Sequence, residues 1–346
     1  MQRSIGAFGG DKDNVMIDGS SAGGGSTANH FVNVHSWPFF HKTAGESGMF
    51  ATWNTMPLES AESHFSLALA NASCSTVACI NALSSYQLQQ AAQWVDLKNS
   101  GAGQNPGVYL AFSPVVDGVD VIGAPWLLAK EGHTHRGPLM LGTARDEGQM
   151  FCPNCPANMT EAGFRSWATS THGYQGADAD TLVGLYKGHK PCTGAGPYFE
   201  YFGHWTEWAW AAIELTGDAG FHCGARLGAR WVSGRQPVYI YHFAPDKAYA
   251  SRHMCFVMHM DEDGGIYGTM DGPLAEQMGR YWYSFAKSGN PNTLRAAGSP
   301  EWTPYDNVTD RNIKFADPIT FETGLRKEQC DYCAGTSRCQ GGPGAE

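Results

Sequence analysis

Three apolar stretches, each followed by polar or glycine-rich residues, mark where strands are expected. Residues 15–17 (VMI) run into the turn-forming sequence DGSSAGG, and a helix-permissive segment follows at residues 27–32. Residues 138–142 (PLMLG) predict a buried parallel strand with polar residues at its C-terminal end. Residues 236–243 (QPVYIYHF) predict another strand, because they are rich in β-branched and aromatic side chains. Open α/β sheets place catalytic groups at the C-terminal ends of strands, so chemistry is expected there.

The remaining pattern is mainly helical. Residues 152–218 have a mixed, mostly helical pattern, and residues 198–212 (YFEYFGHWTEWAWAA) are densely aromatic. Such a segment is more typical of a core or a pocket wall than of a cofactor site. Residues 335–346 are glycine-rich and are expected to form a disordered tail.

Composition limits the classes of function. A chain of 346 residues suits one large α/β domain or two small ones, and a hydrophobic content of 42% is ample for a sizeable core. The net charge is −10 with no basic stripe, which argues against a nucleic-acid partner. No apolar run approaches the roughly 20 residues of a membrane helix. The first residues show no signal-peptide pattern.

The first stretch contains the motif G-x-S-x-G at residues 19–23. Between a strand and a helix, this motif forms a nucleophile elbow, with Ser21 at the tip of a sharp turn. Gly19 and Gly23 are the positions where a side chain is expected to collide across that turn. In a chain with 43 glycines the motif can also arise by chance, so a plain glycine-rich loop is the alternative.

The residues around this motif separate the two interpretations. Residues 5–24 (IGAFGGDKDNVMIDGSSAGG) resemble the type-B carboxylesterase/cholinesterase family of α/β-hydrolases, whose pattern is close to I-x-x-F-G-G-D-P-x-N-V-T-I-x-G-E-S-A-G-G. Ser20 departs from it, because the family usually has an acidic residue there. The resemblance implies an α/β-hydrolase fold with Ser21 as nucleophile and the Ala22 backbone N–H as an oxyanion donor.

The same resemblance assigns the other two members of a catalytic triad. Residues 137–151 (GPLMLGTARDEGQMF) resemble the segment P-L-x-x-G-x-x-x-D-E-G-x-x-F, in which the glutamate is the triad acid, here Glu147. His253 and His259 are candidates for the histidine. Only His259 has a glutamate three residues on and a glycine six residues after that, Glu262 and Gly268. We therefore expect His259 to be the base, although Met260 stands where a glycine is usual.

Further residues take roles only through the resemblance. Residues 39–53 correspond to the next strand of the family, in which Ser47 matches a buried serine that supports the triad. Trp53 matches an aromatic residue of the acyl pocket, with plain core packing as the alternative. Residues 275–292 correspond to a long helix with Gly289 as its C-cap. Two disulfides are implied, Cys74–Cys79 and Cys223–Cys330.

Ten cysteines and three N-x-[ST] sequons, at Asn71, Asn158 and Asn307, favour a secreted or secretory-pathway protein. Two C-x-x-C pairs have a spacing also used for zinc, Cys152 with Cys155 and Cys330 with Cys333, but a local bridge or mixed pairing is the preferred interpretation. The sequence leaves the pairing open for six cysteines: Cys152, Cys155, Cys192, Cys255, Cys333 and Cys339. No metal or cofactor is expected.

Together these features predict a carboxylic ester hydrolase that acts through a Ser21–Glu147–His259 triad and an acyl-enzyme, with a small-molecule ester as substrate. A catalytically inactive fragment or a cholinesterase-like adhesion protein is the alternative. In the family the elbow follows the fifth strand, so residues 1–333 are expected to be a partial domain. On this view the early strands and the glycine-rich oxyanion loop are missing, and residues 334–346 form the tail. The particular ester and the oligomeric state stay open.

Overall fold

The computed structural model describes residues 1–99, 112–152, 155–189, 205–245, 248, 252–258 and 272–335, with side chains in the first range described to residue 93. Six strands form one sheet in the order β1-β2-β5-β6-β7-β8. The strands are β1 (Met16–Ser20), β2 (Lys42–Glu46), β5 (Leu139–Ala144), β6 (Val238–Phe243), β7 (Arg311–Phe315) and β8 (Thr320–Thr323). All neighbours are parallel except β7 and β8, which are antiparallel.

The three apolar stretches predicted as strands form β1, β5 and β6. Every residue of β2, β5 and β6 is buried, as expected for central strands covered on both faces. The segment that resembles the family's next strand contributes β2, followed by the short 3-10 helix η3 (Thr52–Asn54). β1 lies at one edge of this sheet and β8 at the other.

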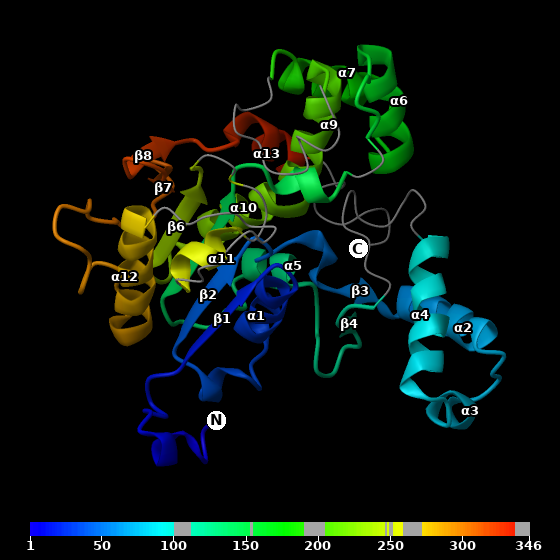
Figure 1. The fold of residues 1–346 in the computed structure, drawn as a ribbon, viewed down its shortest axis with the longest axis horizontal. Helices are drawn as coiled ribbons and strands as arrows, with labels where there is room; N and C mark the ends of the chain where they lie inside the picture. The colour runs from blue at the N-terminus through cyan, green and yellow to red at the C-terminus, as the bar shows by residue number, and fades with distance from the viewer. Residues whose placement is uncertain are drawn as a thin grey trace.

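Helices cover both faces of the sheet (Figure 1). On one face α1 (Ala22–Val32), α5 (Pro125–Glu131) and α10 (Cys223–Val232) pack on Leu139, Leu141 and Ile240. On the other, α11 (Arg252–Val257) and α12 (Gly272–Ser288) pack on Met140 and Tyr241. Successive residues of β5 thus point to opposite faces of the sheet: Leu139 and Leu141 pack in one core and Met140 in the other. This alternation is expected for a strand that is buried on both sides.

The predicted long helix is α12. It ends at Ser288, directly before Gly289. The φ of Gly289 is 75°, a left-handed angle that glycine adopts without strain. Its N–H donates to Phe285 O at 2.7 Å, so Gly289 caps the helix as predicted.

Two groups of elements lie outside the sheet layers (Figure 1). Helices α6 (Glu161–His172), α7 (Ala177–Tyr186) and α9 (Glu207–Gly217) share a core of their own that includes Phe164, Tyr186 and Trp210. The described part of the aromatic segment, Trp205 to Ala212, belongs to this core. Helices α2 (Leu58–Asn71), α3 (Val77–Asn81) and α4 (Ser85–Asn99) stand beside the small parallel pair β3 (Met56–Pro57) and β4 (Val115–Val116).

The shorter elements complete the described chain. They are the 3-10 helices η1 (Ile5–Phe8), η2 (Trp37–Phe39) and η4 (Glu147–Met150), the π-helical turn η5 (Asp218–His222) and the last helix, α13 (Lys327–Ala334). The expected tail lies outside the described residues, apart from Ala334 and Gly335. Among the described helices, none is both long and apolar enough to cross a bilayer.

Candidate active site

Ser21 occupies a sharp turn between β1 and α1. Its backbone angles are φ 56° and ψ −120°, a conformation that non-glycine residues rarely adopt and that tends to persist only at functional positions. Its N–H donates to Glu46 O at 2.9 Å, and its carbonyl accepts from the Gly25 N–H at 3.0 Å. The side chain is partly exposed. The turn thus has the geometry of a nucleophile elbow.

A side chain was expected to collide across the turn at both Gly19 and Gly23, and the structure bears this out only for Gly19. A Cβ on Gly19 would lie 2.3 Å from Gly23 O, so no side chain fits there. The expectation for Gly23 is wrong, because a Cβ at that position meets nothing within 4 Å. The second close approach is at Gly24, where a Cβ would lie 2.7 Å from Glu46 O. The turn is therefore tight because Gly19, at the end of β1, lies directly against the backbone of Gly23.

Ala22 begins α1 directly after Ser21. The first N–H groups of a helix have no partner within the helix, and they carry its positive dipole end. α1 has 11 residues, so its N-terminus can stabilise negative charge beside the Ser21 hydroxyl. The Ala22 N–H is the first of these groups.

Glu147 follows β5 and begins η4. Like Ser21, it therefore lies just beyond the C-terminal end of a strand of the parallel part of the sheet. The side chain is fully buried, and its Oε1 accepts a hydrogen bond of 2.7 Å from the Ala144 N–H. Burial raises the pKa of Glu147 to about 7, against the opposing effects of the Ser47 hydroxyl, the Ala144 N–H and the His253 charge. Within the described residues, Oε2 completes no hydrogen bond of normal geometry, so this oxygen is available to a further donor.

Ser47 and Trp53 both lie beside the elbow. Ser47 is buried at φ 48°, and its N–H donates to Gly142 O at 2.9 Å, which fixes it between β2 and β5. Trp53 is 4% exposed, and its Nε1–H donates to Gly220 O at 2.9 Å. Its ring lies 5.8 Å from that of Phe221, which lies 4.9 Å from that of Phe151. Three aromatic rings therefore form one wall near the elbow.

Of the two candidate histidines, the structure describes His253 but not His259. His259, with Glu262 and Gly268, lies outside the described residues. His253 lies in α11, fully buried, and its Nε2 is 2.8 Å from Glu46 Oε2. Burial opposes its charged form, but the Glu46 carboxylate, followed by those of Glu147 and Asp18, outweighs burial and raises the pKa of His253.

The chain also resembles known proteins along most of its length. The sequence model of the carboxylesterase family matches residues 1–333. This chain belongs to the carboxylesterase family. It is 26% identical to carboxylesterase 4A of Bos taurus over 96% of the chain, and 25% identical to para-nitrobenzyl esterase of Bacillus subtilis over 95%. It spans 62% and 64% of the lengths of these two relatives.

The structural comparison agrees with the family. A carboxylesterase of Geobacillus stearothermophilus superposes with a TM-score of 0.76 at 20% identity, covering 95% of this chain and 66% of the other. The fold is therefore an α/β-hydrolase fold, as the sequence predicted. At this identity the likeness establishes the fold and leaves the chemistry to the residues themselves.

The cysteines of this carboxylesterase family member lie mostly in bridges. The sulfur atoms of Cys223 and Cys330 are 2.07 Å apart, as are those of Cys74 and Cys79. Cys152 is bridged to Cys155, and Cys333 is also disulfide-bonded. In this structure the cysteines of both C-x-x-C pairs lie in disulfides, of which Cys152–Cys155 is a local bridge and Cys223–Cys330 is the pairing that the resemblance implied. Among the described residues no cluster of His, Cys, Asp or Glu could hold a metal ion.

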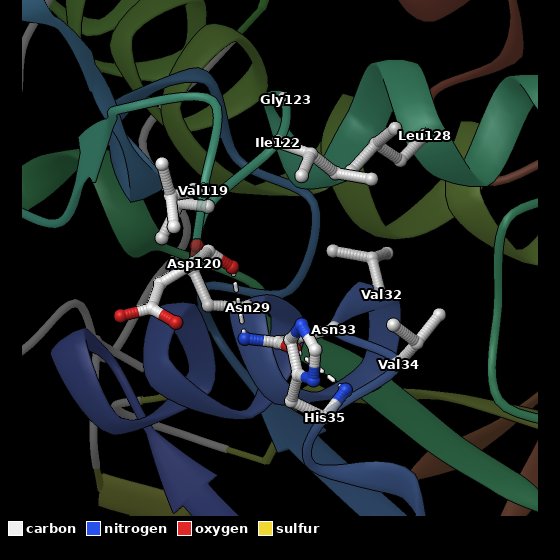
Figure 2. Close-up of a pocket in the computed structure, with 11 residues that line it drawn as sticks. Asn29, Val32, Asn33, Val34, His35, Val119, Asp120, Ile122, Gly123 and Leu128 are labelled. Carbon is white, nitrogen blue, oxygen red and sulfur yellow. Dashed lines mark hydrogen bonds between the residues drawn. The ribbon is translucent and has the colours of Figure 1, made fainter.

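The hollow shown in Figure 2 is separate from the elbow. It lies at the C-terminal end of α1, with Asn33, Val119 and Ile122 among its lining residues. Asn33 Nδ2 donates to Asp120 O at 3.0 Å, which ties the two sides together. Because an 11-residue helix is about 16 Å long, this hollow is distant from Ser21 at the other end of α1.

Sequence reasoning missed the acidic neighbours of the site. Asp18 lies in β1, three residues before Ser21, and Glu46 ends β2. Burial, followed by the Glu46 carboxylate, raises the pKa of Asp18 to about 7, while the His253 charge opposes the rise. The available signal was Glu46, a charged residue within a segment expected to form a strand, because a charge is expensive to bury there unless it is paired.

Proposed function

We propose that the protein is a carboxylic ester hydrolase in which Ser21 is the nucleophile of an acyl-enzyme mechanism. The observation that carries the proposal is the strained turn at Ser21, with the helix N-terminus beside it. A serine hydroxyl is a poor nucleophile at its ordinary pKa and needs a neighbouring base. We assign that role to His259 on its sequence pattern and the role of orienting acid to Glu147, whose buried Oε2 has no hydrogen-bond partner among the described residues.

The chemistry follows from these roles. His259 takes the proton of the Ser21 hydroxyl as its oxygen attacks the ester carbonyl, and the Ala22 N–H binds the resulting oxyanion. The protonated histidine then gives its proton to the leaving alcohol, which leaves an acyl group on Ser21. Water, activated by the same histidine, releases the acid. Glu147 keeps the imidazole in the required tautomer and stabilises its charged form.

The aromatic wall supports a proposal for the acyl side of the substrate. Trp53, Phe151 and Phe221 lie beside the elbow, and the Trp53 ring approaches Gly25 and Gly48 so closely that added Cβ atoms would meet it at 3.1 and 3.0 Å. An apolar acyl group of small size fits such a wall best. The bridged cysteines support a further proposal, that the protein works in an oxidising compartment such as the secretory pathway.

The test is covalent labelling with a fluorophosphonate probe, followed by mapping of the labelled peptide. We expect the label on Ser21, no label in Ser21→Ala, and full labelling in the matched control Ser20→Ala, whose hydroxyl is buried. Hydrolysis of a short-chain p-nitrophenyl ester should fall by on the order of 10⁴ or more in Ser21→Ala and in His259→Ala. Labelling at another residue, or equal labelling of Ser21→Ala, would refute the assignment.

A further inference from the structure

The π-helical turn η5 carries one ring of the aromatic wall. A π turn pairs its carbonyls with N–H groups five residues on, and here the Cys223 N–H donates to Asp218 O. Such single turns are rare and are found frequently at functional sites. Both ends of η5 are fixed from outside, by the ion pair of Asp218 with Arg326 and by the bridge from Cys223 to Cys330. The contacts of its middle residues therefore determine the position of the wall.

Two consecutive residues of η5 contact the rest of the wall. Gly220 O accepts the hydrogen bond from the Trp53 indole N–H at 2.9 Å. The ring of the next residue, Phe221, lies 5.8 Å from that of Trp53 and 4.9 Å from that of Phe151. A displacement of η5 therefore moves one ring of the wall and breaks the hydrogen bond of another.

The third residue, His222, attaches the same turn to β5. Its Nδ1 is 2.7 Å from Thr143 Oγ1, and its ring also hydrogen-bonds to the backbone of Arg145, the residue after the strand. Both side chains of the His222–Thr143 pair are buried. Burial lowers the pKa of His222 to about 4, so near neutral pH the ring is uncharged, with one donor and one acceptor nitrogen. His222 thus links η5 to the strand that precedes Glu147.

We propose that His222 is a positioning residue that limits the length of the acyl group, because its bond to Thr143 holds the turn that carries Phe221. This inference rests on the proposed function, in which the wall faces the acyl side of the substrate. Without the Thr143 hydroxyl, a buried ring nitrogen loses its partner, and movement of the turn relieves that cost. The wall then recedes as Phe221 shifts and the Trp53–Gly220 bond weakens, and longer acyl groups fit.

The test uses variants that separate the hydrogen bond from the shape. Thr143→Val keeps the shape and removes the hydroxyl, whereas Thr143→Ser keeps the hydroxyl. Thr216→Val is the matched control: Thr216 is fully buried two residues before η5, but its hydroxyl donates within α9, to Ala212 O at 2.9 Å. The readout is the ratio of kcat/KM for p-nitrophenyl hexanoate to that for the acetate. A loss of folded enzyme lowers both values equally, so it leaves this ratio unchanged.

We expect Thr143→Val to raise the ratio of hexanoate to acetate by about fivefold, the size of one buried hydrogen bond. Thr143→Ser and Thr216→Val should keep the wild-type ratio. An unchanged or lowered ratio in Thr143→Val overturns the inference, and so does an equal rise in either of the other two variants. His222→Leu removes the same bond from the other side, and the same criteria apply to it if Thr143→Val does not fold.

A second measurement does not depend on activity. Hydrogen exchange of the Trp53 indole N–H, followed by NMR with isotope-labelled tryptophan and assigned with Trp53→Phe, reports its bond to Gly220 O. Exchange should be about fivefold faster in Thr143→Val and unchanged in Thr143→Ser and Thr216→Val.

The two measurements together separate the outcomes. Unchanged exchange in Thr143→Val overturns the inference even if the ratio shifts, because the effect then does not pass through the turn. Faster exchange with an unshifted ratio in an active enzyme overturns the role in specificity. Failure of Ser21 to react with the fluorophosphonate, with faster exchange present, counts against the proposed function alone.

Discussion

Glu147→Gln is expected to make the protein more stable and nearly inactive. The substitution keeps the size of the side chain and an oxygen that can accept the Ala144 N–H, and it removes a fully buried charge. The pKa of Glu147 is about 7, against an ordinary value of 4.5. This difference of about 2.5 pH units corresponds to about 3 kcal/mol at 1.36 kcal/mol per unit.

The sign of the effect depends on pH. Below pH 4.5 the glutamate is protonated in both folded and unfolded chains, so ionisation costs nothing. Between pH 4.5 and 7 the unfolded chain loses its proton while the folded chain keeps it, and stability falls. Above pH 7 the full cost of about 3 kcal/mol applies. The gain in Glu147→Gln should therefore be small at pH 4, intermediate at pH 6 and largest at pH 8.

Urea unfolding of wild type and variant at these three pH values measures the effect. Glu322→Gln is the control of opposite sign: burial raises the pKa of Glu322, but the hydrogen bond and charge of His242 outweigh burial and lower it. Its loss should destabilise the protein near neutral pH. The kcat of Glu147→Gln should fall by on the order of 10⁴, as for a triad acid that no longer fixes the tautomer. A stability gain that does not change with pH would refute the reasoning.

Two predictions concern the elbow and the long disulfide. Gly19→Ala should lower the thermal midpoint strongly and abolish hydrolysis, because the Cβ would lie 2.3 Å from Gly23 O, whereas Gly23→Ala, with open space, should keep or slightly raise stability. Thermal unfolding compares the two, and equal tolerance contradicts the packing argument. Cys330→Ser should cost roughly 4–5 kcal/mol, since the bridge spans 107 residues, and Cys79→Ser roughly 2 kcal/mol, since its bridge spans 5. Urea unfolding decides, and a larger loss in Cys79→Ser would contradict the loop-closure account.

The sequence predicted those parts of the site that are local in the chain. The elbow at Ser21 needs a strand, a tight turn and a helix within about twenty residues, and Glu147 needs only the end of β5. The pair Glu46–His253 could not be found this way, because 207 residues separate its members and only the packing of α11 on the sheet brings them together. Gly23 was misjudged because a motif does not say which of its two glycines makes the contact.

The predicted base, His259, lies outside the residues that the structure describes. His259 was selected because it fits the family's pattern of a histidine, a glutamate and a glycine, so its position relative to Ser21 and Glu147 stays a prediction. The cysteines show the same contrast, since Cys223 and Cys330 were paired through the family pattern, whereas nothing in the sequence selected a partner for Cys333.

The bridge between Cys223 and Cys330 also determines how the protein responds to proteolysis. It encloses β6, α11, α12, β7 and β8 within one covalent loop. A protease that cuts one peptide bond anywhere inside this loop leaves both products joined, with α13 still fastened to α10. Such a nicked chain would migrate as one band without reductant and as two bands with it, and its C-terminal strands could stay in the sheet after the backbone has been cut.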